Sequence, residues 1–161
     1  SAASDVYKRQ ARGSVLSDRR PGTTWFILES PDARTLGFWA MSLTDTTIAL
    51  LQDLIRNGCV NALTADSGQE AKNADTLEAF FAGTDVRVER YEPHPGRVSI
   101  AFTVEGTDPA AEPLTLLGHT DVVPVDEDKW TQDPFGGEIV DGRIYGRGAT
   151  DMLYILSLIH I

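Results

Sequence analysis

Residues 114–152 read LTLLGHTDVVPVDEDKWTQDPFGGEIVDGRIYGRGATDM, and this stretch decides how the chain is expected to fold. It opens with an apolar run, 114–117, which predicts a short buried strand that ends at Gly118. His119 and Asp121 follow at once. An imidazole can bind a metal ion through one ring nitrogen while a carboxylate fixes the ring through the other, so this pair suits a metal site.

A second carboxylate, Asp151, lies near the end of the stretch. It follows residues 146–148 (GRG), whose glycines allow the backbone to approach a neighbouring segment closely. These residues do not fit a phosphate-binding loop, which needs a longer glycine spacing and a lysine. A His-x-Asp pair alone is more often a surface or core feature than a ligand set, so the interpretation depends on the ordered combination with Asp151.

The combination of residues 118–124 (GHTDVVP), Trp130, residues 133–135 (DPF), residues 146–148 and Asp151 resembles one family closely. It looks like the dinuclear-zinc metallopeptidases and deacylases, which include aminoacylase, carboxypeptidase G, acetylornithine deacetylase and succinyl-diaminopimelate desuccinylase. The similarity is densest in this stretch and looser before it. Trp130 and its Asp-Pro-Phe neighbours are expected to anchor an irregular loop by packing rather than to contact substrate.

The resemblance implies roles for three residues. His119 would ligate one zinc ion, Asp151 would bridge the two zinc ions, and Asp121 would orient His119 and influence the general base. It also implies a cis peptide bond between Asp151 and Met152. In the family two adjacent glutamates, the general base and a zinc ligand, come next, followed by another acidic ligand and a histidine; we expect these beyond the end of this chain. The family often has a lysine where this chain has Leu153, a position that varies among members.

For the fold, the resemblance implies an α/β chain: the N-terminal part of an α/β/α zinc-peptidase catalytic domain, truncated before a smaller inserted domain. The complete enzyme, called the parent protein below, would hydrolyse amide bonds of small peptides or N-acyl amino acids through a water activated by two metal ions. Nitrogen and carboxylate ligands fit zinc, and also cobalt or manganese. The fragment itself is expected to be inactive. A non-catalytic binding protein on the same scaffold is the alternative, and peptidase versus deacylase and a homodimeric parent stay open.

Composition and charge argue against several function classes. Of the 161 residues 42% are apolar and 24% charged, as in ordinary globular proteins. The net charge of −10 is concentrated in residues 41–161, which hold twenty acidic and eight basic side chains, so neither nucleic acid nor an anionic membrane is an expected partner. The single cysteine, Cys59, is predicted to be buried rather than nucleophilic, and it favours a cytoplasmic location. No stretch approaches the roughly 18 apolar residues of a membrane span.

Both ends of the chain differ in character from its centre. Residues 1–10 and 156–161 resemble translated adaptor sequence from library preparation, so we expect neither to belong to the native protein. Residues 11–40 scatter Arg, Pro and Gly without a sustained period and are expected to be translated upstream sequence or a disordered leader. Met41 is the expected native start, and residues 41–155 are the expected partial catalytic domain.

Two amphipathic helices are predicted before the decisive stretch. The first spans residues 45–57, with Thr44 as its N-cap and Gly58 in the left-handed position after its end. Its apolar residues recur at steps of three and four: Ile48, Leu51, Leu54 and Ile55. The second begins at a capping box, residues 67–70 (SGQE), and ends at Gly83. Its inward residues are expected to be Ala71, Ala74, Leu77 and Phe81.

The period of the apolar residues then changes from about 3.6 to 2. This change predicts strands at residues 86–89 and 98–104, each with one buried face. The turn between them, residues 93–96, holds His94, which is predicted to be a surface residue. A further hairpin is predicted at residues 138–145, which have Asp-Gly at the turn.

Overall fold

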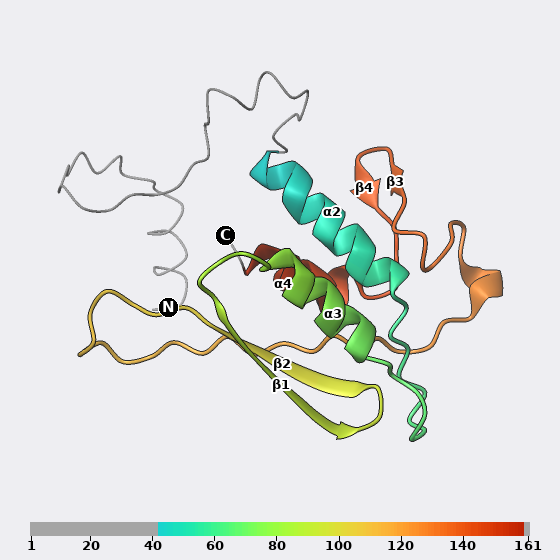
Figure 1. The fold of residues 1–161 in the computed structure, drawn as a ribbon. Coiled ribbons are helices and arrows are strands. Elements are labelled where there is room, and N and C mark those ends of the chain that lie inside the picture. The colour runs from blue at the N-terminus through green and yellow to red at the C-terminus, as the bar shows by residue number, and fades with distance from the viewer. Residues whose placement is uncertain (1–41, 160–161) are drawn as a thin grey trace, which may run out of the picture. The chain divides into compact units, whose positions relative to one another are not determined.

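The structure, a computed structural model, describes residues 42–159. The chain divides into two units, Ser1–Ala40 and Met41–Ile161, and the description concerns the second. The predictions for the first 41 residues and for the last two lie outside the described residues. The described part contains both helices and antiparallel strands, which agrees with the predicted α/β class (Figure 1).

Helix α2, Leu43–Arg56, begins two residues earlier than predicted. Its N-cap is Ser42, not Thr44, which lies within the helix. Ser42 Oγ accepts a hydrogen bond from Asp45 N at 3.1 Å, and the Asp45 carboxylate accepts one from Ser42 N at 3.3 Å, so the two residues form a capping box. Gly58 follows the helix end with φ +56°, as predicted. The buried face carries Leu50, Leu51, Leu54 and Ile55.

Helix α3, Ala71–Phe80, does not begin with the predicted capping box. Ser67 Oγ instead accepts hydrogen bonds from two backbone N–H groups of its own loop. Glu70 occupies the N-cap position without a side-chain cap, and its Oε2 lies 2.7 Å from Arg97 Nε. The prediction is wrong because Arg97, which is partly buried, competes for the carboxylate that the box would use. The buried residues of α3 are Asn73, Ala74 and Leu77.

Strands β1, Arg87–His94, and β2, Arg97–Thr103, form an antiparallel hairpin, as predicted. Only β2 has a buried face: Val98 is buried, and two further residues pack against the core, Ile100 and Phe102. Strand β1 is exposed along nearly all of its length, so the prediction of a buried face on both strands is wrong for β1. His94 is exposed, as predicted.

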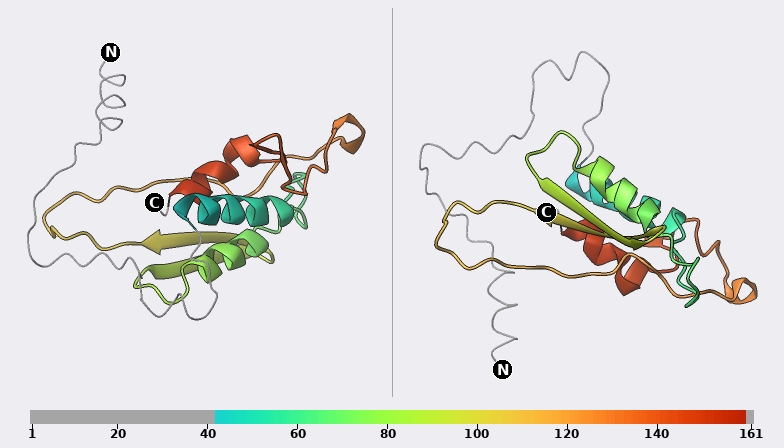
Figure 2. Two further views of the ribbon diagram at one scale, coloured as in Figure 1. Left: turned by 90° about the horizontal axis from the view of Figure 1, so that it is seen from above. Right: turned by 60° about the horizontal axis from the view of Figure 1, so that its bottom comes forward.

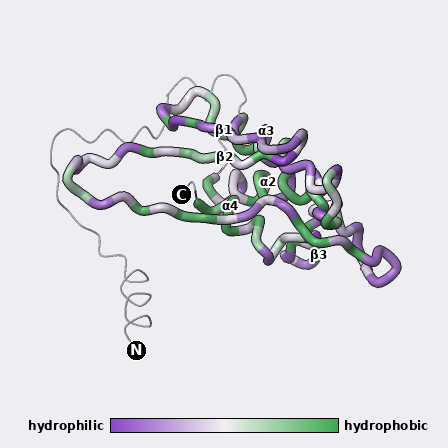
Figure 3. Tube along the Cα trace, turned by 90° about the horizontal axis from the view of Figure 1, so that it is seen from below, coloured by the Kyte–Doolittle hydropathy of each residue, from purple (hydrophilic) through white to green (hydrophobic). Residues whose placement is uncertain are grey.

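The predicted buried strand at residues 114–117 is absent. The segment has no regular structure, and its leucines are exposed, Leu117 to 91%. Figure 3 shows this part of the chain as an extended trace. A strand needs a hydrogen-bonded neighbour and covered faces, and neither two-stranded sheet of residues 42–159 extends to this segment. His119 therefore follows an extended irregular segment and not a strand end.

A second hairpin, β3 (Ile139–Val140) and β4 (Arg143–Ile144), lies where it was predicted. Its turn residues Asp141 and Gly142 have φ +50° and +73°, the signs that an Asp-Gly turn of this kind requires. The acidic loop before the hairpin contains one short helical turn, Glu127–Lys129.

The chain then forms an irregular helical segment, η3 (Ala149–Leu153), and a short helix, α4 (Tyr154–Leu158). Residues 156–158, expected from the sequence to be adaptor-derived, are part of α4. Helix α2 packs against α4 and against α3 (Figures 1 and 2). None of the helices in the described range has the length and apolarity that crossing a bilayer requires.

The core joins the helices to the segments that carry the predicted site. It consists of the four buried residues of α2 together with Leu77, Val122 and Leu153. Val122 follows Asp121 and Leu153 closely follows Asp151 in the sequence, so core packing fixes both neighbourhoods. Cys59 is also buried; its thiol donates to Gln69 O at 3.3 Å, and burial raises its pKa. These properties fit a buried residue rather than a nucleophile.

Candidate metal centre

Residues 119–123 and 146–153 meet because each segment contributes a side chain to the core. Gly148 lies between Val122 and Leu153 and has φ +84°. A Cβ atom at this position would fall 2.4 Å from Val122 Cγ1 and 2.9 Å from Leu153 Cδ1. Only glycine therefore allows the two segments to come this close.

Hydrogen bonds hold the two segments against their surroundings and against each other. Val122 forms a parallel bridge with Val60, and its carbonyl oxygen accepts from Asn61 N at 2.8 Å. The N–H of His119 donates to Met152 Sδ at 3.4 Å, which links the first segment directly to the second. Nearby packing thus sets the positions of the predicted site residues.

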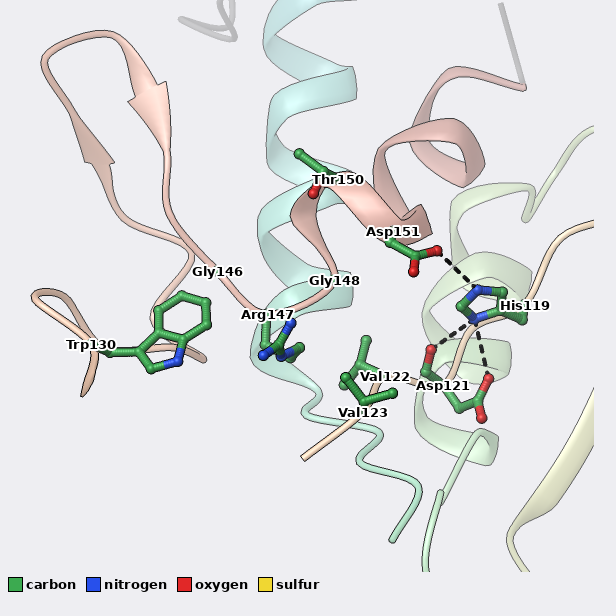
Figure 4. A pocket seen from close by; sticks show the side chains of 10 residues that line it. All are labelled: His119, Asp121, Val122, Val123, Trp130, Gly146, Arg147, Gly148, Thr150 and Asp151. Atoms are coloured by element: carbon green, nitrogen blue, oxygen red, sulfur yellow. Dashed lines mark hydrogen bonds and ion pairs between the residues drawn. The ribbon is translucent and has the colours of Figure 1, made fainter. Parts of the chain in front are cut away.

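The structure brings His119, Asp121 and Asp151 together, and the imidazole lies between the two acids (Figure 4). Its Nδ1 lies 2.9 Å from the backbone oxygen of Asp121 and 3.2 Å from Asp121 Oδ1. Its Nε2 lies 3.3 Å from Asp151 Oδ1. The side chain of His119 is 48% exposed and that of Asp151 89% exposed, so this side of the ring is open. The peptide bond between Asp151 and Met152 is cis, as the resemblance implies.

The groups around Nδ1 determine which ring nitrogen of His119 carries the proton when the ring is neutral. Both oxygens of Asp121 near Nδ1 are acceptors, so Nδ1 must be the donor. Nε2 then presents a lone pair to Asp151 Oδ1, which is also an acceptor. Two acceptors at this separation repel each other unless a proton or another cation lies between them. A metal ion can bind between them, with the Nε2 lone pair and the carboxylate oxygen as its ligands.

The charges at the site also act on the protonation of the imidazole. Partial burial lowers the pKa of His119, but other effects outweigh it. Hydrogen bonds to the Asp121 carbonyl and the Asp151 carboxylate, together with the charges of the two acids, hold the pKa of His119 above its ordinary value. The site therefore attracts a positive charge to the position between His119 and Asp151.

The separation of the two candidate ligand atoms fits a shared cation. Nitrogen and oxygen atoms about 2.0–2.2 Å from a tetrahedral zinc ion lie roughly 3.3–3.5 Å apart. Nε2 of His119 and Oδ1 of Asp151 are 3.3 Å apart. No group of three or more His, Cys, Asp or Glu side chains among residues 42–159 is arranged to hold a metal ion. Because zinc sites in proteins use three or four protein ligands, the described residues would supply only part of one.

Two asparagines at this site escaped the sequence analysis. Asn61 Nδ2 donates to Asp121 Oδ2 at 2.7 Å, and Asn73 Nδ2 donates to Thr120 O at 2.8 Å. Asn73 is fully buried on the face of α3 that also buries Leu77. A polar residue four positions before an apolar core residue was the available signal for Asn73. Asn61 lies in a loop and gave no such signal.

The site opens into a pocket of about 180 Å³, which Trp130 and Arg147 line at the other side of Val122 (Figure 4). The guanidinium carbon of Arg147 lies 5.4 Å from the centre of the Trp130 ring, a cation–π contact. Trp130 thus packs against the side chain of Arg147 and also lines the pocket. Among residues 42–159, Arg147 has no ion-pair partner, and its buried Nε has no hydrogen-bond partner.

Comparison with known proteins gives consistent matches. Residues 115–160 match peptidase family M20/M25/M40. The chain is 44% identical over 106 residues to a succinyl-diaminopimelate desuccinylase of Rhodospirillum centenum, covering 65% of this chain and 26% of that protein. The protein of the same name from Rhodopseudomonas palustris is 37% identical over 114 residues, covering 70% of this chain and 28% of that protein. Succinyl-diaminopimelate desuccinylase 1 of Ruegeria sp. is 41% identical over 114 residues, covering 70% and 27%. The chain thus spans about a quarter of the length of these relatives.

Proposed function

We propose that this chain is part of a metal-dependent hydrolase of peptidase family M20/M25/M40, which cleaves the amide bond of an N-acyl amino acid or a small peptide. One observation carries the proposal: His119 Nε2 and Asp151 Oδ1, from positions 32 residues apart, lie 3.3 Å from each other. Family similarity and the donor set at this contact support the same chemistry.

In this proposal His119 and Asp151 are metal ligands and Asp121 is the orienting carboxylate. A pair of divalent cations, when bound, would lower the pKa of a water molecule at the site and polarise the scissile carbonyl. Asp121 keeps the proton of the neutral imidazole on Nδ1 and so leaves Nε2 free to bind. Asp151 offers two exposed carboxylate oxygens, which is what a bridge between two cations needs. Gly148 lets the two segments meet, and Gly146 lets the second segment lie close to Ile55 of α2.

The relatives' names support an acylated amino acid as the substrate, with a succinyl group as the first choice to test. Such a molecule carries carboxylates. Arg147 lines the pocket without an ion-pair partner among the described residues, and a guanidinium pairs well with a carboxylate. The acidic charge of residues 41–161 supports neither a nucleic acid nor an anionic membrane as a partner. Homodimer formation and a cytoplasmic location are part of the proposal, the latter from the single cysteine.

Zinc is the proposed metal, with cobalt and manganese as substitutes. The general base and the remaining ligands are proposed to lie in the part of the parent protein beyond residue 161. The 161-residue chain alone should then bind zinc weakly and catalyse nothing. Isothermal titration of zinc into the purified chain measures this directly. Tight binding at two sites would contradict the proposal that further ligands are required.

Removal of metal from the parent protein should abolish its amidase activity. A chelator is expected to lower the release of succinate from an N-succinyl amino acid to background, because the water would lose its activation. Addition of zinc, cobalt or manganese should restore the release, whereas magnesium, which prefers oxygen ligands, should restore little. Succinate is measured by an enzyme-coupled assay, and a chelator already saturated with zinc serves as the control. Full activity after complete metal removal would contradict the proposal; metal binding without any hydrolysis would favour a binding protein on this scaffold.

A further inference from the structure

The carboxylate of Asp121 is held at both of its oxygens. Oδ1 lies 3.2 Å from His119 Nδ1, and Oδ2 accepts a hydrogen bond from Asn61 Nδ2 at 2.7 Å. The Asp121 side chain is only 27% exposed, so water competes weakly for these contacts. Rotation of the carboxylate away from His119 would break the shorter of the two contacts.

Asn61 is itself fixed by its neighbours. Its backbone N–H donates to Val122 O at 2.8 Å, and its Oδ1 accepts from Leu63 N at 3.0 Å. Because the end of the amide facing Leu63 must be the acceptor, the end facing Asp121 must be the NH₂ group. The orientation of the amide therefore follows from the hydrogen bonds. Asn61 can only be a donor to Asp121.

We propose that Asn61 is a positioning residue, which holds Asp121 so that His119 presents Nε2 toward Asp151; this inference rests on the proposed metal site. The hydrogen bond from Asn61 Nδ2 to Oδ2 keeps Oδ1 turned toward His119 Nδ1, 3.2 Å away, so that Oδ1 can accept the proton of Nδ1. The neutral imidazole is thereby kept in the form that binds a metal ion through Nε2. Groups that orient a metal-binding histidine in this way typically contribute about 10–100-fold to metal affinity or activity.

A second amide acts on the neighbouring residue and supports the same inference. Asn73 Nδ2 donates to Thr120 O at 2.8 Å, and Asn73 Oδ1 accepts from Asn57 Nδ2 at 2.8 Å. Asn73 is fully buried in α3, so it connects the segment around His119 to the helix layer. The two amides restrain both the backbone and the side chain next to the proposed ligand. Asn61 is the one that contacts the orienting carboxylate.

The test compares N61A with Q52A in the parent protein. Gln52 is a suitable control because its side-chain amide also donates to a distant acceptor, Gly137 O, at 2.7 Å, but away from the site. N61A is expected to weaken zinc binding, measured by competition with a chromophoric chelator, by about 10–100-fold. Q52A is expected to change it by less than about twofold. Equal affinity of N61A and the unmodified protein, or an equal loss in Q52A, would overturn the inference.

A measurement without metal separates this inference from the proposed function. The ¹⁵N spectrum of the His119 ring in the metal-free 161-residue chain should show a proton hydrogen-bonded at Nδ1, and N61A should weaken that signal. The double variant N61D/D121N exchanges the donor and acceptor between the two positions and should restore the signal, as well as most of the zinc affinity. The inference fails if the signal in N61A is as strong as in the unmodified chain, or if the signal in the double variant is as weak as in N61A. Either result counts whether or not the parent protein hydrolyses amides.

Discussion

Replacing His119 with alanine in the parent protein is expected to lower kcat/KM for an N-succinyl amino acid by at least about 100-fold, the size of effect seen when one group that stabilises the reacting charge is lost. The imidazole has no substitute among the described residues, because no other His, Cys, Asp or Glu joins it in a group of three that could hold a metal ion. Its Nε2 is also the atom that faces Asp151. The substitution removes that atom and the contacts of the ring with both carboxylates.

His94 provides the matched control for this experiment. It is exposed at the end of β1 and contacts neither Asp121 nor Asp151. H94A should therefore change kcat/KM by less than about twofold, as is usual for surface substitutions. Initial rates with the zinc-saturated variants give the comparison. Equal losses in both variants, or full activity of H119A, would exclude His119 as a ligand.

Replacing Gly148 with alanine is expected to lower the free energy of unfolding by about 2–5 kcal/mol. An L-residue at φ +84° costs about 1–2 kcal/mol, and the overlap of the new methyl group with Val122 and Leu153 adds about 1–3 kcal/mol. Val122 is β-branched and cannot easily rotate away. Relief of the overlap would move the two segments apart and with them His119 and Asp151.

Gly142 separates the backbone effect from the packing effect. It has φ +73°, but a Cβ there would meet nothing within 4 Å. G142A should thus show only the backbone cost, about 1–2 kcal/mol, and no change in zinc affinity. Urea unfolding of both variants, followed by circular dichroism, measures the difference. If G148A were no less stable than G142A, the close contact between the two segments would be refuted.

The sequence predicted those features whose signals are local. The steps of three and four between apolar residues of α2 identify that helix, and the Asp141-Gly142 pair identifies the turn between β3 and β4. The predicted N-terminal boundary of α2 was wrong because Ser42, Thr44 and Asp45 are three candidate N-caps within one turn. Short-range patterns determine that an element exists better than they determine where it begins.

The segment 114–117 shows where the local signal fails. An apolar run is compatible with a strand, but a strand also needs partners for its backbone groups and cover for its side chains. Within the described range neither is present beside this segment, and its leucines are exposed. Strand formation there depends on parts of a sheet that these residues do not supply.

In the candidate site, too, the sequence predicted some residues and missed others. The order of His119, Asp121 and Asp151 suggested a shared site, and the structure places the three side chains together. Asn61 and Asn73 were missed because their hydrogen bonds to the site join residues 60 and 47 positions apart, which leaves no periodic pattern in the sequence. Candidate ligands can be inferred from residue type and order, whereas their hydrogen-bond partners depend on how distant loops and helices pack.

Anomalous X-ray diffraction at the zinc edge, from crystals of the zinc-loaded parent protein, tests the central claim most directly. The expected result is a zinc peak about 2.0–2.2 Å from both His119 Nε2 and a carboxylate oxygen of Asp151. Zinc bound elsewhere, with His119 and Asp151 in contact only with each other, would contradict the account.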